Sequence, residues 1–230
     1  MAKLVQKSGY IKSGKASGYM RYIATREGVE KLAGNSAVTK GQRELIQKLL
    51  HDFPDAAELF EYEDYCKTPT LGTASAFITM ALDANLHEID SESGYMQYIA
   101  TRPRVQKHGS HGLFSSSTSV DLASAMSELE AHEGNVWTII YSLRREDAAR
   151  LEFDNADAWR TLLMENAPTL AKSMKISLNN FHWYAAFHDE GHHPHIHMMV
   201  WSDDPKEGFL TKGGIAAMRS KLTNAIFRDE

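Results

Sequence analysis

The chain has 230 residues, enough for one large domain with a substantial core, and its 43% hydrophobic and 24% charged residues exclude a disordered, collagen-like or coiled-coil protein. Its one cysteine, Cys66, leaves no intrachain disulfide, which suits a reducing compartment. The start, MAKLVQK, lacks the apolar core of a signal peptide, and the longest apolar runs, at 77–82 and 183–187, are too short to span a bilayer. We therefore expect a cytoplasmic protein with no membrane partner.

The charge is unevenly distributed along the chain. The net charge of −5 by itself argues mildly against a nucleic-acid partner. However, residues 1–50 hold ten Lys and Arg against three acids, and residues 94–112 hold three cations and no acid. This segregation favours a protein with one anion-facing surface, although a set of solvated helix faces would give the same pattern.

The predicted elements alternate between strands and helices. A strand over 3–11 comes first, a Ser/Gly/Lys stretch at 13–18 breaks it, and a helical pattern opens at Ser17. Further helices are expected over 42–65 with a break at Pro54, over 72–85, over 119–132 with Asp121 in the first turn, over 155–174 and over 213–230. Further strands are expected over 137–143, 181–187 and 195–201. This order predicts an α+β fold with one antiparallel sheet and helices packed on it.

An internal repeat crosses this pattern. The sequence GYM-x-YIATR occurs at 18–26 and again at 94–102. Two copies 76 residues apart are too few and too distant for a solenoid, so an old duplication or two similar local tasks could explain them. Each copy offers a tyrosine at the same local position, Tyr22 and Tyr98.

A histidine cluster, FHDEGHHPHIHMMVW at 187–201, carries the densest chemistry of the chain. Residues two apart in a strand point to the same face, so His195 and His197 present both imidazoles on one side. The link 189–194 turns the chain back, which brings His188 beside that pair. Three neutral imidazoles leave open positions on a divalent ion, as in a catalytic metal site, whereas ordinary surface or core histidines are the alternative.

The link between the two strands adds polar residues. A carboxylate there could accept the second ring N–H of a ligand histidine and orient it, and we assign this role to Glu190. Asp189 is the other carboxylate of the link, and both could instead be solvated turn residues. His192 and His193 are expected to be accessory or exposed rather than ligands.

These motifs resemble those of a known family. HDEGHHPHIHMMV resembles the third motif of the conjugative relaxases of the HUH endonuclease superfamily, and 18–32 and 102–115 are similar to MobL-type and broader MobP relaxases. His193 stands where the family has Asn, Ser or Thr before the proline. The resemblance implies an HUH relaxase-like α+β fold, a central antiparallel five-stranded sheet with the histidine pair on a middle strand and helices on its faces. It also implies one nicking domain over 1–230, with a helical insertion about 40–90. The C-terminal helical pattern has no Gly or Pro stop signal, so we expect that helix to lead to a further domain.

The resemblance also implies an activity and a set of site residues. Such relaxases nick one DNA strand at a plasmid or integrative-element origin of transfer by metal-assisted tyrosine transesterification. This leaves a 5′-phosphotyrosine link and a free 3′-OH, which starts conjugative mobilisation. The metal ligands would be His188, His195 and His197. The nucleophile would be Tyr22, with Tyr19, Tyr98 and Tyr10 as alternatives, because Tyr22 lies in the YIATRE block that most resembles the family's first motif. The first strand is also expected next to the histidine strand, so a residue just past its end could reach the metal.

The implied cofactor is a divalent metal ion, Mn or Mg in use, with Zn, Ni or another transition metal compatible with imidazole ligands. The partners would be single-stranded origin-of-transfer DNA, auxiliary relaxosome factors and a coupling protein. The residues expected to contact DNA phosphates are Lys12, Lys15, Arg21, Arg26, Arg102, Arg104 and Lys107.

Two other functions are compatible with the same residues. A histidine-triad nucleotide hydrolase or transferase has a His-x-His-x-His pattern, which His193, His195 and His197 match, and its chemistry requires no metal, so a chelator would separate the two enzymes. A non-catalytic metal-containing DNA-binding module would form no covalent DNA adduct.

Overall fold

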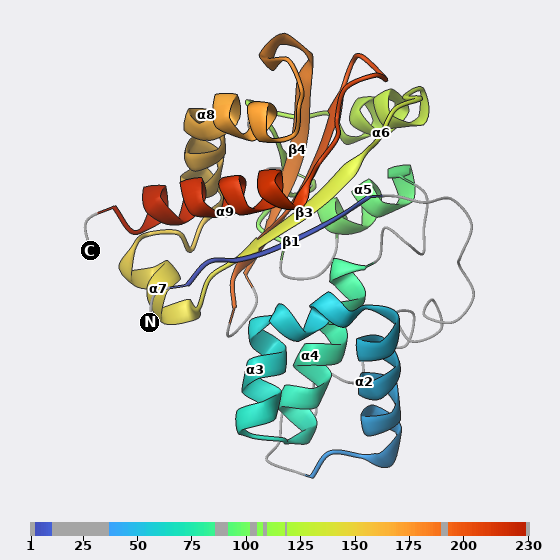
Figure 1. Ribbon diagram of the computed structural model, residues 1–230, viewed down its shortest axis with the longest axis vertical. Coiled ribbons are helices and arrows are strands. Elements are labelled where there is room, and N and C mark those ends of the chain that lie inside the picture. Colours follow the sequence, from blue (N-terminus) through green and yellow to red (C-terminus); the bar gives the residue numbers. More distant parts are fainter. Residues whose placement is uncertain are drawn as a thin grey trace. The chain divides into compact units, whose positions relative to one another are not determined.

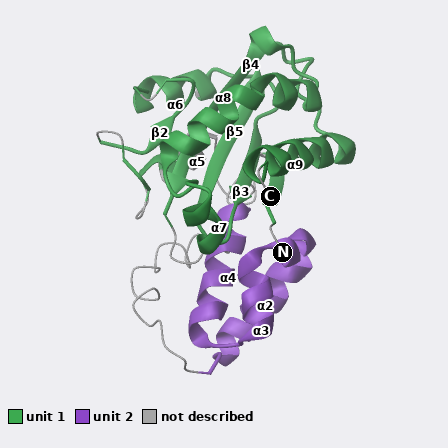
Figure 2. Cartoon of the chain, turned by 90° about the vertical axis from the view of Figure 1, so that its left-hand side faces the viewer, with its two compact units in different colours: residues 1–11, 91–230 green, residues 12–90 purple. Residues whose placement is uncertain are grey.

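The computed structural model describes residues 3–10, 37–85, 92–101, 105–107, 110–117, 119–189 and 193–228. The chain divides into two compact units, one of Met1–Ile11 with Ser91–Glu230 and one of Lys12–Asp90 (Figure 2). The first unit holds the sheet and the second holds a group of helices. That residues 1–230 act as one nicking domain stays a prediction.

The first unit is built on a five-stranded sheet, in which every pairing is antiparallel (Figure 1). The strands are β1 (Val5–Tyr10), β2 (Leu113–Phe114), β3 (Trp137–Ser142), β4 (Phe181–His188) and β5 (His195–Ser202). Their order across the sheet is β1-β3-β5-β4-β2. The predicted α+β fold with a five-stranded antiparallel sheet and the histidine pair on a middle strand is therefore confirmed.

Two details of the sheet differ from the prediction. We expected the first strand next to the histidine strand, but β3 lies between β1 and β5. This prediction was wrong because β3 pairs with β5 along one edge and with β1 along the other. The fifth strand, β2, was not predicted from its residues, since two residues are too short to show an alternating pattern.

The two faces of the sheet have different compositions. Directly opposed residues of antiparallel strands share a face, and one face is apolar and joins the main core with the long helices. Strand residues in this core are Phe114, Ile139, Tyr141, Trp183, Ala185, Phe187, Ile196, Met198 and Val200. The helices on this side contribute Trp159, Leu163, Met218 and Leu222. The opposite face carries the three predicted ligand histidines.

The described residues of the first unit form six helical segments. They are α5 (Glu92–Thr101), α6 (Leu122–Glu130), α7 (Arg145–Arg150), α8 (Ala156–Ser173), the short 3-10 helix η5 (Leu178–Asn180) and α9 (Lys212–Ile226). In Figure 1, α8 and α9 lie on one side of the sheet, and α5 and α6 lie on the other. The prediction placed Asp121 in the first turn of a helix starting near Ser119. Instead Asp121 caps α6, because its carboxylate accepts the backbone N–H of Ser124 at 2.8 Å.

The second unit contains α2 (Lys40–Asp52), the 3-10 helix η3 (Pro54–Glu58), α3 (Phe60–Lys67) and α4 (Leu71–Ala84). Capping boxes at Thr39 and Thr70 start α2 and α4, and the predicted break falls at Pro54. Phe77 packs on the ring of Tyr62, with the centroids 5.0 Å apart. Across both units, no described helix combines the length and the apolar character that crossing a membrane requires.

The glycine at 112 allows a close backbone approach beside the end of β4, the strand that carries His188. Gly112 donates its N–H to Ala100 O at 2.8 Å. A Cβ there would collide with the Val105 side chain and lie 2.8 Å from Gln106 O. Because Gln106 O is backbone, we expect Gly112→Ala to lower the free energy of unfolding by about 1–3 kcal/mol in denaturant titrations. Gly41→Ala is the control, since a Cβ at Gly41 meets nothing within 4 Å, and an equal loss in both variants would contradict the argument.

Candidate metal centre

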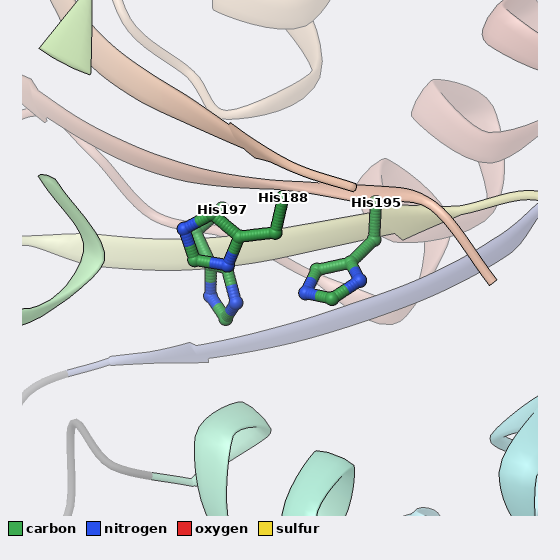
Figure 3. Close-up of side chains that lie close together, drawn as sticks. All are labelled: His188, His195 and His197. Atoms are coloured by element: carbon green, nitrogen blue, oxygen red, sulfur yellow. The ribbon is translucent and has the colours of Figure 1, made fainter. Parts of the chain in front are cut away.

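Three buried imidazoles converge on one face of the sheet (Figure 3). His188 ends β4 and pairs with His195 at the start of β5, while His197 pairs with Ala186 of β4. Strand parity therefore places all three side chains on the same face. One ligand nitrogen from each ring lies within 4.8 Å of the other two, and the three residues are at most 1% exposed. Among the residues that the structure describes, this is the one cluster of three or more side chains able to hold a metal ion.

Main-chain carbonyls orient two of the three rings. His188 Nε2 lies 2.8 Å from Ile99 O, and His195 Nδ1 lies 3.0 Å from His193 O. A carbonyl can only accept, so each of these nitrogens carries the proton. The other ring nitrogen, Nδ1 of His188 and Nε2 of His195, is then the one with a lone pair for an ion.

The backbone around His188 is held from the neighbouring segment. Val105 forms a bridge with His188, and Gln106 donates its N–H to Phe187 O at 2.9 Å. Beyond the strand end, Asp189 forms an ion pair with Arg145, with 2.6 Å between Oδ1 and Nη2. These contacts fix the end of β4, so the His188 ring is placed by the fold rather than by the link alone.

The donor set fits a divalent transition metal. Three neutral imidazoles with open remaining positions are the arrangement of catalytic zinc sites, and imidazole nitrogen also suits Ni, Cu and Fe. The three residues are buried, so bulk water competes little with an ion for the imidazole nitrogens. The three residues therefore fit a divalent metal ion, the cofactor that the resemblance implied.

The other end of the same face carries a polar and aromatic network of different character. Tyr184 donates to Glu128 Oε2 at 2.8 Å, and His182 lies 2.8 Å from Asp203 and stacks on Trp201. Burial and the Glu128 carboxylate raise the pKa of Tyr184 to about 12. This phenol is therefore harder to ionise than an ordinary tyrosine, which makes Tyr184 a poor nucleophile even though it shares the histidine face.

The structure describes only some of the other predicted site residues. Lys107 is exposed beside the segment that bridges His188. Tyr98 belongs to α5, the helix that supplies Ile99, although only its backbone is described. Tyr10 packs on Trp137 with ring centroids 5.4 Å apart, on the face opposite the histidines. The predicted residues outside the described part of the chain are Lys12, Lys15, Tyr19, Arg21, Tyr22, Arg26, Arg102, Arg104 and Glu190.

Sequence reasoning missed the carbonyls of Ile99 and His193 as partners of the ligand rings. Main-chain atoms have no residue signature, so no motif could have identified them. The one available signal was the repeat, because Ile99 lies in its second copy. The assignment of a similar partner role to Glu190 stays a prediction.

The sheet order, the helices on both faces and the three converging histidines define a relaxase-like α+β protein. The family model of the MobL relaxases matches the chain over residues 1–230, and the chain belongs to this family. Membership makes it a DNA-binding protein with a DNA-nicking role. Neither the curated proteins nor the solved structures contain a match.

Proposed function

We propose that this protein nicks one DNA strand at an origin of transfer by tyrosine transesterification and so starts conjugative mobilisation of a plasmid or integrative element. The observation that supports this most directly is the buried cluster of His188, His195 and His197 in a chain of the MobL relaxase family. The reaction exchanges one phosphodiester for another, so it needs no nucleotide cofactor. As a nuclease of the HUH type, the protein would work in the cytoplasm with auxiliary relaxosome factors and a coupling protein.

The three histidines would hold the divalent ion. When bound, a divalent cation, Mn or Mg in the cell, would polarise the scissile phosphate and neutralise charge that develops on its oxygens. The chain contributes fixed ring orientations, since Ile99 O and His193 O determine which nitrogen of His188 and of His195 carries the proton. Preset rings lose little freedom when they bind an ion or a phosphate near it.

Tyr22 is the proposed nucleophile. Its phenol oxygen forms a bond to phosphorus while the bond from phosphorus to the 3′ oxygen breaks. The departing oxygen takes a proton and becomes the 3′-OH, the phenol proton is released, and the 5′ phosphate stays on the tyrosine. Tyr98 and Tyr19 are the alternatives. Tyr98 is supported as a candidate nucleophile by its neighbour Ile99, whose main-chain carbonyl contacts His188. Tyr10 is disfavoured as the nucleophile, because it lies on the face of the sheet opposite the histidines.

The basic residues of the N-terminal segment and of 102–107 would contact the phosphates of the DNA strand. These contacts predict that the affinity for DNA depends steeply on salt concentration. With about seven phosphate contacts, affinity for single-stranded DNA should fall roughly a thousandfold between about 50 and 200 mM salt. Replacing Lys107 by glutamine should reduce the slope of log affinity against log salt by about 0.7. The control is Lys221→Gln on α9, an exposed lysine on the helix that packs on the other face of the sheet. A salt-independent affinity would contradict the proposed contacts.

The deciding experiment is incubation with a library of single-stranded oligonucleotides and Mn²⁺ or Mg²⁺, followed by denaturing gel detection of protein-linked DNA. The proposal expects a covalent adduct that is lost on chelation. Nucleotide hydrolysis that resists a chelator would favour the histidine-triad hydrolase. Metal-dependent DNA binding without an adduct would favour a non-catalytic module.

A further inference from the structure

The three ligand histidines differ in how their backbones are held. His195 and His197 belong to β5, which pairs with β3 on one side and with β4 on the other. His188 is the last residue of β4, and on the outer side of that strand β2 pairs only with Ala185 and Ala186. The position of His188 therefore depends on what holds the outer edge of β4 beyond β2.

A short segment at 105–106 continues the pairing where β2 stops. Val105 forms an antiparallel bridge with His188, and Gln106 donates its N–H to Phe187 O at 2.9 Å. A piece of two residues contributes few hydrogen bonds, and ordering its backbone costs conformational entropy. It therefore needs a second attachment if it is to hold the end of the strand in place.

The side chain of Gln106 provides this attachment. Its Oε1 accepts the N–H of Ala156, the first residue of α8, at 2.7 Å. The first N–H groups of a helix have no partner within the helix, so the Gln106 amide satisfies one of them. The helix itself is anchored in the main core through Trp159 and Leu163, which are fully buried. Gln106 thus joins the end of β4 to a helix that the core holds in place.

We propose that Gln106 is a positioning residue for the metal centre, because its side chain keeps the His188 ring in the orientation that Ile99 O and a bound ion require. This inference rests on the metal centre of the proposed function and adds a residue that acts through Phe187 and His188. A displaced strand end would change the 2.8 Å contact between His188 Nε2 and Ile99 O. Loss of a residue that orients a metal ligand from outside typically weakens metal binding roughly 10- to 100-fold.

The test compares Gln106→Leu and Gln106→Glu with the wild-type protein. The readout is Mn²⁺ affinity in calorimetric titrations, so it does not depend on turnover. Leucine keeps most of the volume but offers no acceptor to Ala156, whereas glutamate keeps the acceptor and adds a negative charge that a helix N-terminus favours. We expect Gln106→Leu to bind Mn²⁺ about tenfold more weakly and Gln106→Glu to keep the wild-type affinity.

Asn155→Ala is the matched control. Asn155 caps the same end of α8, because its Oδ1 accepts the N–H of Ala158 at 2.9 Å, and its amide N–H groups contact residues 152 and 154. The control therefore removes a hydrogen bond from the same helix terminus and lowers stability without releasing the end of β4. Its Mn²⁺ affinity should equal that of the wild type. An equal loss in Asn155→Ala and Gln106→Leu would show that Gln106 acts only through the stability of α8, and wild-type affinity in Gln106→Leu would also overturn the proposal.

The metal-free protein gives a second readout. The nitrogen chemical shifts of an imidazole report which ring nitrogen carries the proton, and comparison with His188→Ala identifies the His188 signals. In the wild type and in Asn155→Ala, His188 should carry its proton on Nε2, whereas Gln106→Leu should show a mixture of the two tautomers. An unchanged tautomer in Gln106→Leu would contradict the proposal even if the Mn²⁺ affinity fell. Should Gln106→Leu not fold, Gln106→Ala removes the same acceptor and gives the same comparison.

The two proposals fail in different ways. If the wild type and His188→Ala bind Mn²⁺ equally, the histidines do not form the metal centre and the proposed function loses its main support. The tautomer of His188 in the metal-free proteins then still decides whether Gln106 positions the ring. If the wild type binds Mn²⁺ through the histidines and forms the covalent adduct while Gln106→Leu keeps its affinity, only the role of Gln106 is wrong.

Discussion

Replacing His197 by alanine is expected to abolish metal-dependent nicking, with a loss of roughly a thousandfold or more, because one of three ligands to the ion is removed. His188→Ala and His195→Ala should behave in the same way. Metal binding gives an independent readout. A bound ion stabilises the folded protein by about 2.7 kcal/mol at a hundred times its dissociation constant, so Mn²⁺ should raise the melting temperature of the wild type and not of the variants.

His182→Ala is the matched control for these variants. His182 lies on the same strand and the same face as His188, but it contacts Asp203 and Trp201 rather than the other histidines. This variant should keep both nicking and the thermal response to the metal. A His197→Ala protein that nicks at the wild-type rate with unchanged metal affinity would show that the three histidines are not the metal ligands.

Replacing Tyr22 by phenylalanine is expected to remove covalent attachment to DNA while leaving metal and DNA binding at wild-type strength. The substitution deletes only the hydroxyl, which supplies the attacking oxygen, and keeps the ring. The measurement is a denaturing gel for the adduct, together with affinity for a single strand and for Mn²⁺. Peptide mapping of the wild-type adduct then identifies the linked residue directly.

Tyr98→Phe and Tyr19→Phe are the controls for the nucleophile. Tyr98 occupies the same place in the repeat as Tyr22. Comparing the two variants therefore shows whether the nucleophile is defined by its place in the fold or by the residues that flank it. Both control proteins should still form the adduct. An adduct mapped to Tyr98 or Tyr19, or one that survives in Tyr22→Phe, would assign the reaction to the other residue.

The convergence of the histidines could be predicted from the sequence, because it depends on two local rules. Strand parity put His195 and His197 on one face, and a six-residue link returned His188 to their side. The main-chain carbonyls that contact the rings could not be predicted from the sequence. Ile99 meets His188 from a helix 89 residues earlier in the chain, through a carbonyl that every residue has.

The sheet was predictable where a strand has its own pattern and not where neighbours define it. The run at 137–143 is rich in β-formers and became β3. Leu113 and Phe114 form a strand only because β4 offers Ala186 and Ala185 as partners. The order of strands is likewise a tertiary property, which is why β1 was expected beside β5 although β3 separates them.

The alternation along β5 has a consequence for how the hairpin folds. Every residue of β5 is buried, with His195 and His197 on one face and Ile196 and Met198 on the other. A slip of one residue against β4 would turn both imidazoles into the apolar core and bring two aliphatic side chains beside His188. The slipped pairing would move the polar rings from one another's neighbourhood into apolar surroundings and lose core packing at the same time. The histidines thus discriminate against misregistered β5, so replacing them with apolar residues would also weaken the selection of a single strand alignment.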